Sequence, residues 1–146
     1  MNSSTVHLLD LNVLIALLEQ AHVHHEAAFT WFCTPGLQWA LCPFTEAGLV
    51  RYMIQPKGGN LPMPDAVGLL ETLKQQPGHH FSPAVDSWIT LTEPFRSRLH
   101  GHNQVTDAYL LGIAKREGQL LVTFDKGVLH LAGDSEYAAH LRLLDA

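Results

Sequence analysis

The sequence predicts an α/β fold with a central, mainly parallel sheet. Short apolar runs, typical of buried strands, alternate along the chain with longer segments whose apolar residues recur at helical spacing. Strands separated by helices favour crossover connections, which make neighbouring strands parallel. Two of the predicted strands end directly before an aspartate, Asp10 and Asp125. Sites in such folds lie beyond the carboxyl ends of the strands, so both aspartates are candidate site residues.

The first half of the chain contains two predicted strands and three predicted helices. Asn12 is a good N-cap residue for the first helix, and Pro43 suits the first turn of the third. The segment 55–64 holds three prolines and two glycines and is predicted to be a loop. In order, the elements are a strand Val6–Leu9, a helix Val13–Glu19, a helix from His24 to about Cys33, a strand Gln38–Leu41 and a helix from Pro43 to about Ile54.

The second half continues the alternation. A predicted helix Asp65–Gln75 ends before the Pro77-Gly78 pair, Phe81 is placed in a short strand, and a helix is expected within 86–99. The strongest helical signal follows, with Asn103 as the cap residue and Gly118 after the last turn. The remaining elements are a helix from Asn103 to about Glu117, a strand Leu120–Phe124 and a last edge strand Leu141–Leu144.

The composition is that of a globular protein, and we interpret residues 1–146 as a single domain. Of the 146 residues, 47% are hydrophobic and 16% charged, and no repeat or low-complexity segment interrupts the chain. The apolar run Leu11–Leu18 is much shorter than the roughly 20 residues of a membrane span. No basic residue precedes it, as one would in a secretory signal. We therefore expect no membrane association and a cytoplasmic location.

Four acidic residues stand alone in segments that otherwise have core composition. Each is the only Asp, Glu, Lys or Arg of its segment, and two of them lie three and four residues before leucine or valine on a predicted helix face. An ionised carboxylate that faces a core is costly unless a cation meets it. The four acids are Asp10 in segment 5–18, Glu46 in 38–50, Asp107 in 99–114 and Asp125 in 118–125.

A bound metal ion would account for all four acids together. Carboxylate oxygens suit hard cations, Mg²⁺ or Mn²⁺ rather than zinc. Clustered carboxylates that hold one or two such ions hydrolyse phosphodiesters, because the ions generate hydroxide, orient the phosphate and stabilise the leaving oxygen. The formal charge of −5 argues against a broad electrostatic nucleic-acid binder but is compatible with a nuclease.

Each acid taken alone has a simpler interpretation. Asp10 could belong to the cap or turn before the first helix, and Asp125 could be an ordinary turn residue. Glu46 could pair with Arg51 or with a distant cation. Asp107 could be a satisfied acid near a helix start, where the helix dipole favours anions. The metal hypothesis therefore depends on all four acids meeting in one place.

Four segments of the sequence resemble the four acidic motifs of PIN domains, in particular those of the VapC toxins of bacterial toxin–antitoxin pairs. The segments are LLDLNVLIALL, CPFTEAGLVR, QVTDAYLLGIA and LVTFDKG. They run from Leu8 to Lys126 in the family's order, so the resemblance covers most of the chain. The segment HEAAFTW, from His25 to Trp31, also resembles the second helix of one VapC subgroup.

This resemblance implies a PIN-like three-layer α/β/α fold and an Mg²⁺- or Mn²⁺-dependent endoribonuclease that acts as the toxin of a type II toxin–antitoxin pair. It also implies RNA as substrate, a homodimer, and inhibition by a cognate VapB-like antitoxin. Asn12 and Thr123 match polar positions that could orient a carboxylate or a water. By match, the catalytic and metal-binding acids are Asp10, Glu46, Asp107 and Asp125.

Several other polar residues remain open in function. Arg51 is a candidate for phosphate contact and equally for a surface or salt-bridged residue. His100 and His102 precede the Asp107 helix and could touch phosphate, although surface roles are favoured. We interpret the cluster of His22, His24 and His25 as exposed or capping residues.

Two other function classes compete with the nuclease. A phosphohydrolase of the haloacid-dehalogenase type also has an aspartate after its first strand, but it needs a second aspartate two residues on, where this chain has Asn12. A covalent aspartyl-phosphate would identify that class. A non-catalytic RNA-binding or interaction module is the other alternative, and the presence of all four acids counts against it.

Overall fold

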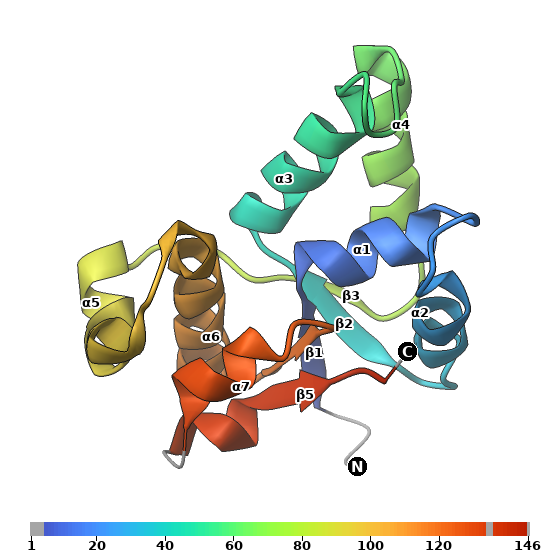
Figure 1. The fold of residues 1–146 in the computed structure, drawn as a ribbon. Coiled ribbons are helices and arrows are strands. Elements are labelled where there is room, and N and C mark those ends of the chain that lie inside the picture. The colour runs from blue at the N-terminus through green and yellow to red at the C-terminus, as the bar shows by residue number, and fades with distance from the viewer. Residues whose placement is uncertain (1–4, 134–135, 146) are drawn as a thin grey trace.

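The computed structural model of the chain describes residues 5–133 and 136–145 (Figure 1). Its five strands form one sheet in the order β3-β2-β1-β4-β5, and every pair of neighbouring strands is parallel. The predicted α/β fold with a parallel sheet is confirmed. The strands are β1 Val6–Leu9, β2 Gln38–Leu41, β3 His79–Phe81, β4 Leu120–Thr123 and β5 Leu141–Leu143.

Helices connect these strands and cover both faces of the sheet. The α-helices are α1 Leu11–Leu18, α2 His25–Phe32, α3 Pro43–Ile54, α4 Met63–Lys74, α5 Trp88–Thr92, α6 Val105–Glu117 and α7 Gly127–Ala132. Three short 3₁₀ helices are η1 Glu93–Arg98, η2 His102–Gln104 and η3 Glu136–His140. None of the helices described here is long and apolar enough to cross a membrane.

Two apolar cores lie on opposite faces of the sheet. Leu9 and Val122 pack toward α1 to α4, whereas their neighbours Leu8 and Leu121 pack toward α6 and α7. Because successive side chains of a strand point to opposite faces, a strand buried on both faces is a continuous apolar run. Figure 1 shows α5 and α6 to the left of the sheet, α1 above it, α2 to its right, and α3 with α4 as a projecting pair. This is the predicted three-layer α/β/α arrangement.

The structure corrects two predicted helix caps. Asp10, and not Asn12, is the N-cap of α1, and its side chain accepts a hydrogen bond from the Leu11 backbone N–H. Asn103 does not cap the later helix, because it lies in η2 and α6 begins at Val105. Gly118 ends α6 at φ +66°, in the left-handed conformation that favours glycine, as predicted.

Helix α7 lies in a segment for which the sequence pattern predicts no element. Its buried residues Val128, Leu131 and Ala132 stand at helical spacing and pack in the same core as α6. Six residues are less than two helical turns, too few to show a period. α7 nevertheless matters for the site, because its first residue, Gly127, follows the aspartate at the end of β4 by two positions.

We predict that Gly112→Ala destabilises the protein by about 1–3 kcal/mol. A Cβ at Gly112 of α6 would lie 2.8 Å from the Leu91 carbonyl oxygen, so α5 would have to move. Gly68 of α4 is the matched control, since a Cβ there meets nothing within 4 Å. Gly68→Ala should stabilise by up to about 1 kcal/mol, as alanine costs less in a helix than glycine. Urea unfolding measures both changes, and equal effects would contradict the close α5–α6 contact.

Candidate functional site

The site is built where the two central strands β1 and β4 end side by side. Leu9 pairs with Val122 in register, and the backbone N–H of Asp10 donates to the Val122 carbonyl at 2.9 Å. This bond continues the strand pairing one residue beyond β1. Asp10 therefore stands at the carboxyl edge of the sheet directly beside Thr123, the last residue of β4.

The Asp10 carboxylate is buried and held by two donors. Only 6% of the residue is exposed. Its Oδ1 accepts from the Leu11 N–H at 2.7 Å, and its Oδ2 accepts from the Thr123 hydroxyl at 2.8 Å. Burial raises the pKa of Asp10, the two hydrogen bonds lower it, and the charge of Asp125 raises it further. The carboxylate is thus fixed in orientation and kept in an environment that disfavours its charge.

Thr123 and Asn12 form the scaffold around Asp10. The Thr123 hydroxyl is fully buried, donates to Asp10, and accepts from the Asn12 side-chain amide at 3.1 Å and from the Asp125 N–H at 3.0 Å. A hydroxyl has one donor and two acceptor positions, so all three are in use. The Asn12 Oδ1 accepts from the Phe124 N–H at 3.2 Å. Both predicted supporting residues therefore link the end of β1 to the segment after β4.

Asp107 and Asp125 complete a group of three aspartates. Asp107 lies in the first turn of α6 and is half-buried. Its pKa is raised to about 7, first by burial, then by the charges of Asp10 and Asp125, and by a hydrogen bond with Asp125 that favours the protonated carboxyl. Asp125 is exposed, and its Oδ1 accepts from the Gly127 N–H at 2.8 Å. The charge of Asp125 contributes to the raised pKa of Asp10, and the charges of both contribute to that of Asp107, so the three carboxyl groups share one electrostatic environment.

Glu46, the fourth predicted acid, is not brought to the three aspartates. Its Oε2 lies 2.5 Å from the Lys74 Nζ of α4, and that ammonium also lies 5.1 Å from the centre of the Phe81 ring. The sequence left open whether Glu46 pairs with Arg51 or with a distant cation, and the structure shows the distant cation, Lys74. Glu46 and Val50 of α3 line a groove together with Leu70 of α4.

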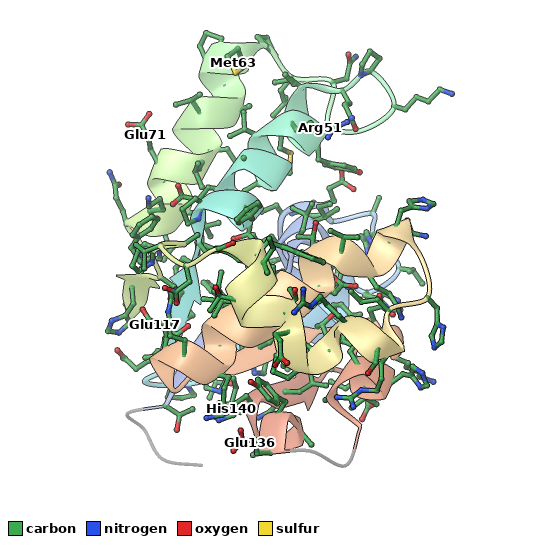
Figure 2. All side chains as sticks on the ribbon, turned by 90° about the vertical axis from the view of Figure 1, so that its left-hand side faces the viewer. Arg51, Met63, Glu71, Glu117, Glu136 and His140 are labelled. Atoms are coloured by element: carbon green, nitrogen blue, oxygen red, sulfur yellow. The ribbon has the colours of Figure 1, made fainter. Side chains whose placement is uncertain are left out.

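Arg51, unlike Glu46, lines the same hollow as Asp10. It is exposed and lines, together with Asp10, Ala47 and Gly48, a hollow of about 290 Å³ between α1, α3 and α6. Figure 2 shows Arg51 on α3, above the layer formed by α5 and α6. The hollow therefore combines a guanidinium with a buried carboxylate, which is the environment expected for phosphate held beside a metal ion.

The chemistry of the three aspartates fits a hard divalent cation. All the donors are carboxylate oxygens, the ligands of Mg²⁺ and Mn²⁺, and a cation would offset the repulsion that raises the pKa of Asp107. As they stand, no three Asp, Glu, His or Cys side chains within residues 5–133 and 136–145 are grouped closely enough to hold an ion. Binding an ion at this group would therefore require the side chains of Asp107 and Asp125 to rearrange toward Asp10.

The histidine clusters contribute no further acid or metal group to this site. The His22 ring accepts from the His24 N–H at 3.0 Å, and His25 contacts the Ala16 carbonyl at 2.8 Å. All three are partly buried, and His24, at the N-cap of α2, makes no side-chain capping hydrogen bond. The His24 ring stacks on Phe124 with centres 4.6 Å apart. His100 lies with His130 of α7, at 3.4 Å between their Nε2 atoms.

Two contributors to the site were not identified from the sequence. One is the Gly127 N–H, a backbone group that carries no residue-type signal. The other is Phe44, an aromatic residue that lines the Asp10 hollow although 49% of it is exposed. Apolar residues in a helical pattern are normally assigned to the core, so Phe44 gave no signal of a surface role.

We predict that Asp107→Asn stabilises the metal-free protein at about pH 8 by about 1–2 kcal/mol, a figure reduced for solvent screening. Because the folded-state pKa of Asp107 is about 7 and its ordinary value 3.8, its protonation favours the folded state. That contribution is complete below about pH 4 and is lost as the pH rises through about 7. The advantage of the variant should therefore disappear at about pH 4.

Thermal melts in chelator at the two pH values measure this difference. Asp65→Asn is the control, because Asp65 is an exposed acid in the first turn of α4, outside the group of three. It should not stabilise, since an acid near a helix N-terminus is favourable. A clearly lower melting temperature for Asp107→Asn at the higher pH would mean that the ionised carboxylate makes a stabilising contact.

Comparison with solved structures supports the fold. The chain is similar to VapBC2 from Rickettsia felis bound to a DNA fragment from its promoter (TM-score 0.65, 12% identity, 97% of this chain and 100% of that one). It is also similar to FitAcB from Neisseria gonorrhoeae (TM-score 0.59, 23% identity, 86% and 92%) and to the sarcin-ricin-loop-cleaving toxin VapC20 from Mycobacterium tuberculosis (TM-score 0.58, 12% identity, 91% and 93%). At these identities the likeness concerns the fold, and the expected PIN-like architecture is confirmed.

Sequence comparison identifies the family. No model of a protein family matches the chain. Three ribonucleases of Mycobacterium tuberculosis, however, are similar over most of their length: VapC38 at 41% identity (86% of this chain and 89% of that protein), VapC44 at 38% (94% and 98%) and VapC29 at 37% (87% and 91%). With the fold and the group of three aspartates, two after strand ends and one in the first turn of α6, these relatives show that the chain belongs to the VapC ribonuclease family.

Proposed function

We propose that the chain is an endoribonuclease that needs Mg²⁺ or Mn²⁺ and acts as the toxin of a type II toxin–antitoxin pair. The observation that carries this proposal is the grouping of Asp10, Asp107 and Asp125 at the carboxyl edge of the sheet, where burial and the charges of Asp10 and Asp125 raise the pKa of Asp107 to about 7. The names of its relatives as VapC ribonucleases support the substrate class. Its RNA substrate makes the cytoplasm the proposed place of action.

Asp10, Asp107 and Asp125 would hold the ion. When bound, the ion supplies a hydroxide from water at neutral pH and stabilises the negative charge that develops on the phosphodiester. The fixed orientation of Asp10, set by the Leu11 N–H and the Thr123 hydroxyl, presents its oxygens without further ordering. The Gly127 N–H restrains Asp125 in the same way.

The remaining polar residues of the site would orient the substrate and the ligands. Arg51 lines the hollow that holds Asp10, so its guanidinium can bind a phosphate oxygen of RNA through two hydrogen bonds. Asn12 acts through Thr123 and the Phe124 N–H, and we propose it as a positioning residue. Thr123 has the same role toward Asp10.

The two competing functions find less support. A haloacid-dehalogenase-like phosphohydrolase would need an acid or base two residues after Asp10, and Asn12 there is engaged with Thr123 and Phe124. A non-catalytic RNA-binding module gives no reason for placing Asp107 near Asp10 and Asp125, whose charges contribute to its raised pKa. The relatives named as ribonucleases point the same way.

The proposed partners follow from the family and from one groove. We propose that residues 1–146 act as a single PIN domain that forms a homodimer and is inhibited by a VapB-like antitoxin; VapBC2 of Rickettsia felis is a solved structure of such a pair. A mainly apolar groove between α3 and α4, lined by Val50, Ile54, Met63 and Leu70, also borders Arg51. An amphipathic segment of the antitoxin lying there could direct an arginine toward the aspartates.

Metal removal and loss of a ligand test the mechanism. Cleavage of RNA should require Mg²⁺ or Mn²⁺ and stop in excess chelator. Asp10→Asn should lower the rate by about 100-fold or more, because a metal-bound carboxylate is replaced by a neutral amide. Asp65→Asn, outside the site, is the matched control and should cleave like the unmodified chain. Cleavage that continues undiminished in chelator would contradict a metal-dependent nuclease.

A pair of variants tests the role of Glu46. Since Lys74 already neutralises Glu46, we expect Glu46→Gln to lower cleavage by less than about tenfold, whereas loss of a metal ligand costs far more. Lys74→Met should have a similarly small effect, and each change should cost at most about 1 kcal/mol of stability, as for other partly exposed ion pairs. If Glu46→Gln is as damaging as Asp10→Asn while Lys74→Met is harmless, Glu46 is a metal ligand, as the sequence motif implies.

A further inference from the structure

Phe44 is an exposed aromatic residue at the rim of the site. It is the second residue of α3, 49% of it is exposed, and it lines the same hollow as Asp10, Arg51 and Thr106. Burying a ring of this size would be favourable, so its exposure beside charged groups needs an explanation. The arrangement places an apolar ring next to a cation and a carboxylate in a hollow of about 290 Å³, room for roughly ten water molecules.

The ring of Phe44 is held in place from one side. It contacts the Tyr109 ring of α6 at 5.0 Å between centres and 67° between planes, an edge-to-face arrangement. Tyr109 is buried, and its hydroxyl donates to the Asp86 carbonyl. Because this contact is not a face-to-face stack, it leaves a face of the Phe44 ring uncovered. A ring fixed in this way loses little conformational entropy when a flat partner stacks on it.

We propose that Phe44 is a nucleobase-stacking residue, which holds the base of a nucleotide next to the scissile phosphate. This inference rests on the proposed ribonuclease function. Single-stranded RNA is recognised largely by bases that stack on aromatic side chains, with cationic groups on the phosphates. In the hollow that contains Asp10, Phe44 provides the aromatic side chain and Arg51 provides the cationic group. The subsite would position the RNA chain on the metal-binding aspartates.

A side chain of a protein partner could also stack on the Phe44 ring, but the residues around the ring favour RNA. The apolar groove suited to a protein segment lies between α3 and α4, and its lining includes Met63 and Leu70 but not Phe44. The hollow at Phe44 combines apolar residues, among them Leu11 and Leu110, with the polar groups of Asp10, Arg51 and Thr106. A nucleotide matches that mixture, because its base is apolar on its faces while its phosphate and ribose are polar.

The test begins with a random-sequence RNA library cleaved by the unmodified chain in Mn²⁺. Sequencing the new 5′ ends gives a preferred cleavage site, and short RNAs containing it become the substrates. Each nucleotide that flanks the cut is then replaced, one at a time, by an abasic nucleotide. A chain that cleaves no RNA overturns the ribonuclease and the subsite together, because the second rests on the first.

Variants of Phe44 then separate stacking from other roles. We expect Phe44→Ala to raise KM about tenfold with little change in kcat, the factor that corresponds to about 1.4 kcal/mol of lost stacking. Phe44→Leu should behave like Phe44→Ala, since it keeps an apolar contact with Tyr109 but has no aromatic face. Phe44→Trp should retain the KM of the unmodified chain. Phe29→Ala is the matched control: Phe29 is 52% exposed, lies on α2, and does not line the hollow.

The abasic substrates give the decisive comparison. At one flanking position the abasic nucleotide should raise the KM of the unmodified chain about tenfold and leave that of Phe44→Ala unchanged, because the stacking partner is already lost. Melting temperatures of all variants check that the fold is intact. If each abasic nucleotide affects Phe44→Ala as much as the unmodified chain, or if Phe44→Ala keeps its KM, the proposal is overturned.

Discussion

The hydrogen bond from the Thr123 hydroxyl to the buried Asp10 carboxylate is the interaction on which the site and much of the local fold depend. It joins two residues 113 positions apart, at the ends of the two central strands. The same carboxylate caps α1, and the same hydroxyl accepts from Asn12 and from the backbone of Asp125. A buried charge must have such partners. Satisfying Asp10 therefore also sets where α1 begins and where the segment after β4 leads.

This network explains how a group of like charges is tolerated in a small protein. Three nearby carboxylates disfavour the folded state, as the raised pKa of Asp107 shows. The apolar cores on both faces of the sheet supply the compensating stability. The aspartates lie where those cores end, at the edge of the sheet, so that Asp125 is exposed and Asp107 half-exposed. Water reaches the acids there, and so can an ion and a substrate.

Much of this architecture could be predicted from the sequence, and the omissions have physical causes. β1 and β2 were predictable to the residue, because each is a short apolar run bounded by polar or helix-starting residues. The contact partner of the Glu46 side chain could not be predicted. Helical spacing shows that Glu46 lies on the same side of its helix as Leu49, but it does not show that Lys74 of α4 lies opposite. The preference of Asn12 for a cap was overridden because Asp10, two residues earlier, accepts from the Leu11 N–H. Such choices depend on contacts across the chain.

The pairing of β1 with β4 also determines when during synthesis the site can exist. β2 follows β1 by about 30 residues, so these two strands can pair early. The other neighbour of β1 is β4, which begins at Leu120. Pairing β1 with β4 closes a much longer loop, which costs more chain entropy and comes later. Until then one edge of β1 is unpaired, and Asp10 lacks Thr123, Asp107 and Asp125. A nascent chain on the ribosome, surrounded by RNA, therefore cannot assemble the aspartate group before nearly all of it has been made.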